Sequence, residues 1–180
     1  GRLRGGGQVK VIEGLENRVV FIGMDQGRDE LLYSSVKGKN PFKDVRVRRA
    51  LYHGIDIEAI NRTTMRGLSK PTGAILPSPK TSTPEIEKRL PFDRDRAKKL
   101  LADAGYPNGF EVTLDCPNNR YVNDEKICQA IVSMWARVGV KTNLLAENMA
   151  TFIQKVQNFD TSAYLLGWGV ATYDAQYTLQ

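Results

Sequence analysis

Apolar positions follow two different periods along the chain, and in the second half these two patterns alternate. The helical period, with apolar residues three and four positions apart, predicts helices over residues 93–104, 124–138 and 148–156. Alternation of apolar and polar residues, or short apolar runs, predicts strands over residues 110–116, 140–145 and 163–168. Strands that alternate with helices in this order predict an α/β fold, in which helices flank a mainly parallel sheet.

The first half of the chain is less regular. Short β-prone runs occupy residues 9–12, 18–23 and 31–33, and each is expected to form a short strand. Asp44 is suited to cap a helix and to pair with Arg48 one turn later, and Val47, Ala50 and Leu51 would form the apolar face of that helix.

A second, shorter helix is expected to follow. Asp56 is a good cap for it, and Gly67 would end it. Four prolines between residues 69 and 84 predict an irregular loop.

Composition narrows the class of protein. The chain has 180 residues, 41% of them hydrophobic and 26% charged, which suits one ordinary globular domain. No apolar run is long enough to span a membrane, and none follows the basic residues at the start as it would in a secretion signal. The net charge of +6 is spread among acids and is not interleaved with stacking aromatics, so no nucleic-acid partner is expected.

The cysteines and the single histidine carry little chemistry by themselves. Two cysteines cannot complete a structural zinc site, so no metal or other cofactor is expected. Cys116 and Cys128 are compatible either with a disulfide, worth roughly 3 kcal/mol for so short a loop, or with two separately buried thiols. His53 is expected to be a partly exposed structural residue.

Several segments resemble, in the same order, those of one family. Residues 40–51, NPFKDVRVRRAL, closely resemble the "N-x-PF-x-D-x-RVR-x-A" segment of bacterial family 5 extracytoplasmic solute-binding proteins, the dipeptide, oligopeptide and nickel receptors of ABC transporters. Further matches are the "D-x-x-KAKxLLAEAGY" helix at residues 92–106, "GFxxTL" at 109–114, "L-x-x-IGIKV" at 135–142 and "D-x-x-x-x-GW" at 159–168. Each segment is weak evidence alone, but their shared order is specific.

The resemblance implies a fold, a function and a cellular location. The chain would form one lobe of a two-lobed periplasmic binding protein of type II-like fold: residues 1–30 lie near the inter-lobe hinge, and residues 31–180 form the second lobe without its C-terminal part. It would belong to the substrate-binding component of an ABC importer, which captures a peptide or other small polar organic solute for the membrane permease. Such a receptor is periplasmic, either free or lipid-anchored, and this fragment would be monomeric.

The resemblance also implies ligand-binding residues, because ligands bind at the carboxyl ends of parallel strands. In peptide-binding relatives an arginine of the loop after residues 110–116 pairs with the ligand carboxylate. Arg120 occupies that place, beside Asn119 and Tyr121, and an arginine fork suits a carboxylate. The alternative for Arg120 is a surface arginine in a polar loop.

Other candidate residues lie near the chain end and near residue 33. Trp168 would wall the pocket, unless it is a core tryptophan. Relatives hold the ligand amine with an aspartate where this chain has Ala171, so Asp174 or another group would have to replace it. Tyr33 would approach the cleft from a strand end, the alternative being a strand entering a turn.

Two other classes of function remain as alternatives. An enzyme on an α/β fold is one, but the sequence has no G-x-S-x-G, no P-loop, no dinucleotide-binding glycine motif after a strand and no H-E-x-x-H. A basic nucleic-acid-binding domain is the other, and it rests on charge alone. The resemblance therefore favours a binding protein that is not an enzyme.

Overall fold

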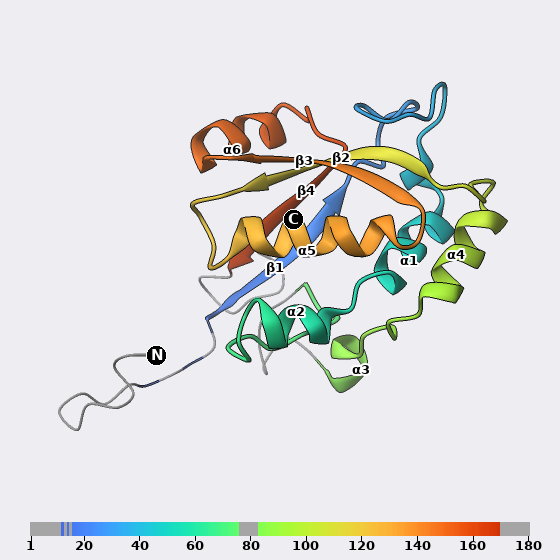
Figure 1. Cartoon of the computed structure of the whole chain (residues 1–180). Coiled ribbons are helices and arrows are strands. Elements are labelled where there is room, and N and C mark those ends of the chain that lie inside the picture. Colours follow the sequence, from blue (N-terminus) through green and yellow to red (C-terminus); the bar gives the residue numbers. More distant parts are fainter. Residues whose placement is uncertain (1–11, 13, 15, 76–82, 170–180) are drawn as a thin grey trace.

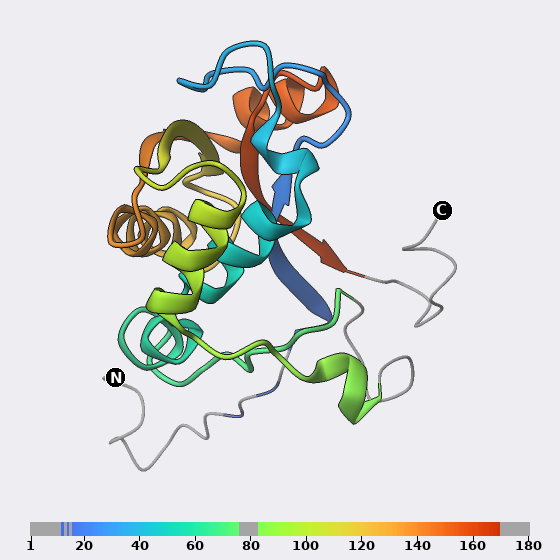
Figure 2. The same cartoon turned by 90° about the vertical axis from the view of Figure 1, so that its right-hand side faces the viewer.

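The computed structural model describes residues 12, 14, 16–75 and 83–169, which build a four-stranded sheet with helices on both faces (Figures 1 and 2). The strands are β1 (Arg18–Met24), β2 (Phe110–Pro117), β3 (Val140–Glu147) and β4 (Ala163–Gly169), arranged in the order β1-β4-β2-β3. β2 runs parallel to β3 and to β4, and β1 pairs with β4 in the antiparallel sense. The predicted α/β fold with a mainly parallel sheet is confirmed.

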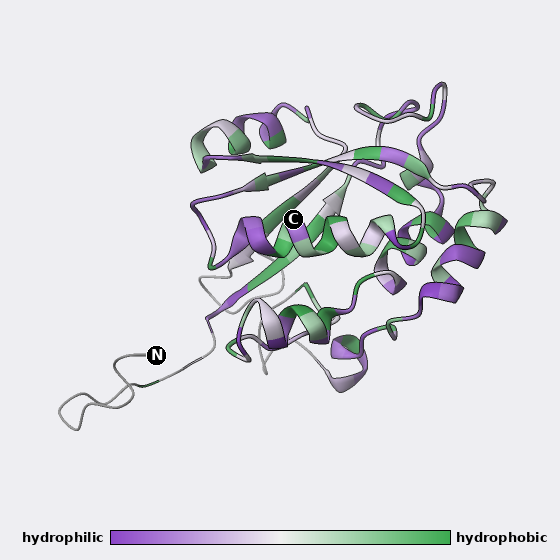
Figure 3. Cartoon of the chain, viewed as in Figure 1, coloured by the Kyte–Doolittle hydropathy of each residue, from purple (hydrophilic) through white to green (hydrophobic). Residues whose placement is uncertain are grey.

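Six α-helices connect or flank the strands in the part of the chain that the structure describes. They are α1 (Val45–His53), α2 (Ile57–Thr63), α3 (Pro84–Glu87), α4 (Arg94–Asp103), α5 (Asp124–Ala136) and α6 (Met149–Gln157), and a single 3-10 turn, η2 (Pro41–Lys43), precedes α1. In Figure 1, α5 and α6 lie on opposite faces of the sheet. Figure 3 shows that β1 and β4 are largely hydrophobic, whereas hydrophilic residues cover much of α4.

Successive side chains of β2 explain why both faces are covered. Cys116 faces α5, where it bonds to Cys128, and the preceding residue Asp115 faces α6, where it pairs with Lys155. The main core lies on the α5 side and includes Trp135, which is fully buried and donates its Nε1–H to the carbonyl oxygen of Leu51 at 3.1 Å. A strand buried on both faces fits the central position of β2 in the sheet.

The predicted cap and apolar face of the first helix are confirmed. The Asp44 carboxylate accepts the backbone N–H of Arg46 at 2.8 Å, and Val47, Ala50 and Leu51 are fully buried. Arg48 forms no salt bridge with Asp44, although its charge helps to lower the pKa of that carboxyl. Asp44 instead forms an ion pair with Arg46 at 2.6 Å.

Arg48 turns in the other direction, toward the preceding 3-10 turn. Its guanidinium donates to the carbonyl oxygens of Phe42 and Lys43. Such short turns leave carbonyl groups without backbone partners, so they attract a nearby cation.

Two other expectations are corrected. Residues 31–33 form a turn and not a strand, because the Leu31 N–H bonds to the carbonyl oxygen of Lys39 and Tyr33 has a left-handed backbone with φ of 48°. His53 is buried and not partly exposed, and its Nδ1 has a buried partner in the carbonyl oxygen of Pro91 at 2.7 Å. The expected strand at residues 9–12 and part of the proline-rich loop lie outside the described residues.

Candidate ligand-binding edge of the sheet

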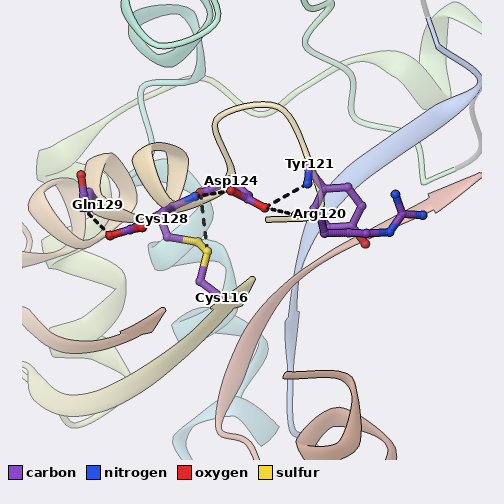
Figure 4. The surroundings of a disulfide bond; sticks show 7 residues. Cys116, Arg120, Tyr121, Asp124, Cys128 and Gln129 are labelled. Carbon is purple, nitrogen blue, oxygen red and sulfur yellow. Dashed lines mark hydrogen bonds between the residues drawn. A yellow bond between two sulfur atoms is a disulfide. The ribbon is translucent and has the colours of Figure 1, made fainter. Parts of the chain in front are cut away.

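The loop after β2 folds onto the end of β4. The hydroxyl of Tyr121 donates to the carbonyl oxygen of Gly167 at 3.2 Å, which joins two segments that lie 46 residues apart in the sequence. Because β2 and β4 are parallel, both segments lie at the carboxyl edge of the sheet. Figure 4 shows Arg120 and Tyr121 at this place, beside β1 and β4.

Gly167 provides the space for this contact. A Cβ atom on Gly167 would lie 2.7 Å from Cε1 of Tyr121 and 3.1 Å from Cδ of Arg18, so a larger residue would displace the tyrosine ring. The glycine before Trp168 therefore has a packing role, which is to let a ring and an arginine stem lie directly over the strand.

A buried carboxylate fixes the backbone of the loop. Asp124, the first residue of α5, is 4% exposed, and its Oδ2 accepts the backbone N–H groups of Arg120 and Tyr121, each at 2.9 Å. Its Oδ1 accepts the N–H of Glu125, also at 2.9 Å. Hydrogen bonds to a charged acceptor are among the stronger ones, and a negative charge is stabilised at the start of a helix. Arg120 and Tyr121 are therefore held by their backbones.

A disulfide closes the same loop. Cys116 at the end of β2 is bonded to Cys128 on α5, and both residues are fully buried (Figure 4). Of the two alternatives left open by the sequence, the structure contains the bridge. The closed loop carries Arg120 and Tyr121, so the bridge limits the movement of both candidates relative to the sheet.

The guanidinium of Arg120 extends from this fixed loop into solvent. Its Cζ lies 5.3 Å from the centroid of the Tyr121 ring, within the range of a cation–π contact. Among the described residues it forms no ion pair with a carboxylate. Arg120 is thus an exposed cation on a rigid base, as a site for a carboxylate requires.

Arg18 reaches the same tyrosine from β1. Its Cζ lies 5.5 Å from the ring centroid, and its guanidinium forms an ion pair with Glu16 at 2.9 Å. No pattern in the sequence pointed to Arg18 as a candidate. The only signal was an arginine at the start of a strand, and its neighbours depend on the antiparallel register that pairs Arg18 with Gly169.

Trp168 and Asn119 lie toward the other face of the sheet. Strand alternation directs Trp168 away from the side on which Tyr121 covers Gly167, and the tryptophan is 39% exposed beside its β1 partner Val19. The side-chain oxygen of Asn119 accepts the N–H of Met149 at 2.8 Å, at the start of α6. The two residues flank the carboxyl edge, with Arg120 and Tyr121 on its other side.

Tyr33 is not brought to this edge. The turn that carries Tyr33 is hydrogen-bonded to Glu111 near the start of β2. This is the end of the sheet opposite to the carboxyl edge. The Tyr33 hydroxyl donates to Oδ1 of Asp160 at 2.6 Å, and this hydrogen bond raises the pKa of the tyrosine above its usual value. The remaining candidate, Asp174, lies outside the described residues.

A largely buried ion pair, Asp115 with Lys155, lies under α6 on the opposite face of β2 from the disulfide. Burial raises the pKa of Asp115, which is completely inaccessible, although the hydrogen bond from Lys155 opposes that shift. Burial alone would lower the pKa of Lys155, but the hydrogen bond and the charge of Asp115 raise it. The pair attaches α6 to β2, and Nζ of Lys155 also lies 5.8 Å from the ring centroid of Tyr33.

Comparison with known proteins decides the family. Residues 2–180 match the family described as bacterial extracellular solute-binding proteins, family 5 Middle. The chain belongs to this family of solute-binding proteins. The family is one of binding proteins, so the resemblance stated above is confirmed.

Two curated relatives show the range of the family. Over 133 residues the chain is 32% identical to heme-binding protein A of Haemophilus influenzae, covering 72% of this chain and 24% of the relative. Over 147 residues it is 29% identical to the glutathione-binding protein GsiB of Shigella flexneri, covering 78% of this chain and 28% of the relative. The chain thus spans about a quarter of the length of these relatives.

Solved structures share the fold. A dipeptide-binding protein from Pseudoalteromonas sp. SM9913, in complex with Met-Leu, aligns with a TM-score of 0.72 and 25% identity, over 97% of this chain and 33% of that one. The binding protein AgaA from A. tumefaciens R10, in complex with agropinic acid, aligns with a TM-score of 0.65 and 28% identity, over 83% of this chain and 29% of that one. The predicted likeness to one part of a periplasmic binding protein is confirmed.

The described residues contain neither a metal-binding cluster nor a membrane-spanning helix. No group of three or more His, Cys, Asp and Glu residues in that part of the chain is arranged to hold a metal ion. Among the same residues, no helix is both long and apolar enough to cross a membrane.

Proposed function

We propose that this chain is the second lobe of the substrate-binding component of an ABC importer. The complete receptor would capture a peptide or other small polar organic solute between two lobes and deliver it to the membrane permease. It would act outside the cytoplasm, in the periplasm, without a cofactor and without nucleic acid. The family match along almost the whole chain supports this proposal, as does the likeness to binding proteins in complex with a dipeptide and with agropinic acid.

The observation that carries the proposal is the fixed loop at the carboxyl edge of the sheet. Asp124 and the disulfide hold the loop, and Arg120 extends from it with its guanidinium exposed. A guanidinium can donate two parallel hydrogen bonds to a carboxylate. Closure of the other lobe would exclude water from this pair and strengthen it, since Coulomb interactions grow as the local dielectric falls.

The chemistry of the lobe favours an acidic solute. Arg120 offers a site for a carboxylate, whereas Ala171 stands where peptide-binding relatives have the aspartate that holds the ligand amine. An ammonium group buried without a partner would cost several kcal/mol, so a free α-amine is not expected to be required.

Calorimetric titration of the complete two-lobed protein tests the proposal. The ligands are a simple dipeptide, its N-acetylated form, and a set of small organic acids. We expect at least one carboxylate-bearing compound to bind, and Arg120→Gln to weaken that binding by about 1.5–3 kcal/mol, the usual value of a hydrogen bond to a charged group.

The control is Arg137→Gln, which removes the same charge from the opposite end of α5. If Arg120→Gln left the affinity unchanged, Arg120 would not be part of the binding site. Binding of the free dipeptide but not of its acetylated form would show that an amine site exists despite Ala171. If no carboxylate-bearing compound bound, the proposed solute class would be wrong.

A further inference from the structure

Two arginines from distant parts of the chain meet on one aromatic ring. Arg18 of β1 and Arg120 of the loop after β2 place their guanidinium carbons 5.5 and 5.3 Å from the centroid of Tyr121. Both distances lie within the range in which a cation is attracted to an aromatic ring. The carboxyl edge of the sheet therefore presents two cations, and the resemblance to known receptors accounted for only one of them.

The ring that both arginines share is fixed. Its hydroxyl is bonded to the carbonyl oxygen of Gly167, its backbone N–H is bonded to Asp124, and the missing side chain of Gly167 gives it room against β4. The stem of Arg18 lies over the same glycine, where a Cβ atom would approach its Cδ to 3.1 Å. The ring and the stem of Arg18 are thus held by the strands and the loop, and the Arg120 guanidinium extends from that loop into solvent.

The present partner of Arg18 can be exchanged. Its guanidinium is paired with Glu16 at 2.9 Å, and the Glu16 side chain is 67% exposed whereas that of Arg18 is 23% exposed. An ion pair with one strongly exposed member contributes little stability, because water solvates the carboxylate almost as well. A carboxylate of the solute can therefore replace Glu16 at small cost.

We propose that Arg18 is a second anion-binding residue of this edge and that the solute carries two acidic groups. The inference rests on the proposed function and narrows its substrate class to diacids, such as a peptide with an acidic side chain or an N-substituted acidic amino acid. Each guanidinium takes one carboxylate, and the ring of Tyr121 positions both guanidiniums. Bringing both carboxylates to the edge relieves the repulsion between the two cations.

The test uses the complete two-lobed protein and two pairs of ligands that differ only by a carboxylate or an amide. The first pair is alanyl-glutamate and alanyl-glutamine, and the second is N-acetylglutamate and N-acetylglutamine. We expect the diacid of at least one pair to bind about tenfold or more tightly than its amide. Arg18→Gln should remove that preference and leave binding of the amide almost unchanged, and Arg18→Lys should retain part of it.

Two further variants separate the possible outcomes. Arg137→Gln controls for net charge and should keep the preference for the diacid, and Arg120→Gln should weaken both members of a pair. If either pair binds and Arg18→Gln leaves the ratio of diacid to amide affinity unchanged, the second site is wrong while the proposed function stands. If none of the four compounds binds, both the diacid site and the small acidic solute are wrong.

Discussion

The disulfide between Cys116 and Cys128 should contribute measurably to the stability of the domain. The bridge joins residues 12 positions apart, and closing a loop of this length lowers the entropy of the unfolded chain. The chain-entropy relation gives about 3 kcal/mol at 25 °C for such a loop. Reduction should therefore destabilise the folded chain by about that amount without removing any atom from the core.

Thermal unfolding followed by circular dichroism, with and without a reductant that reaches buried bridges, measures this effect. For a domain of 150–250 residues, 1 kcal/mol corresponds to about 2–4 °C in Tm, so we expect reduction to lower the Tm by about 6–12 °C. Mass spectrometry after alkylation should find two modified cysteines only in the reduced sample. The double variant Cys116→Ala/Cys128→Ala should lose somewhat more stability, since it also removes two buried sulfur atoms.

Two results would refute this reasoning. Alkylation of both cysteines in the native, unreduced protein would show that the bridge is absent. A reduced sample with a verified pair of free thiols and an unchanged Tm would show that the bridge forms but does not restrain the unfolded chain. The double alanine variant separates the two contributions, because an effect present there and absent on reduction belongs to packing.

Two further substitutions test the fold. Lys155→Met should cost about 3–5 kcal/mol at pH 7 because it leaves Asp115 buried and charged. Burial holds the pKa of Asp115 in the folded chain above 3.8, so the folded chain keeps a proton that the unfolded chain has released, and stability falls as pH rises through this range. Urea unfolding should therefore show that the loss of stability becomes smaller toward pH 4. A loss of stability that does not change with pH would contradict this reasoning. Gly109→Ala should prevent stable folding, because its Cβ would lie 1.7 Å from the carbonyl oxygen of Gly139 and because residue 109 has a φ of 71°, which favours glycine. A variant that melts within about 2 °C of the wild type would contradict this prediction.

Much of the fold could be predicted because its signals are local. Caps such as Asp44 and Asp56 act within two or three residues, and the apolar face of α1 follows the helical period. The predicted elements are wrong where one local sequence pattern is compatible with two backbone structures. Residues 31–33 are β-prone, but Leu31 is a buried residue in a turn because its backbone bonds to Lys39.

The candidate site could be predicted in part only. Arg120, Asn119 and Tyr121 follow a strand directly, so the rule that ligands bind at carboxyl ends located them. The prediction for Tyr33 assumes a strand end near the cleft, but the structure places Tyr33 at the opposite end of the sheet. A resemblance between short segments gives the order of elements, but it does not give the edge of the sheet on which a turn lies.

The roles of Arg18, Asp124 and Gly167 depend on contacts that no local pattern encodes. Gly167 was part of a recognised strand motif, but its packing role appears only when Tyr121, 46 residues earlier, lies over it. Arg18 joins the same group because β1 runs antiparallel to β4, which brings the start of one strand beside the end of the other. The sequence thus indicated Arg120 as a candidate, and the structure adds the residues that hold its loop in place and the second cation beside it. The proposed specificity of this lobe would therefore depend on the pairing of β1 with β4 as much as on the loop after β2.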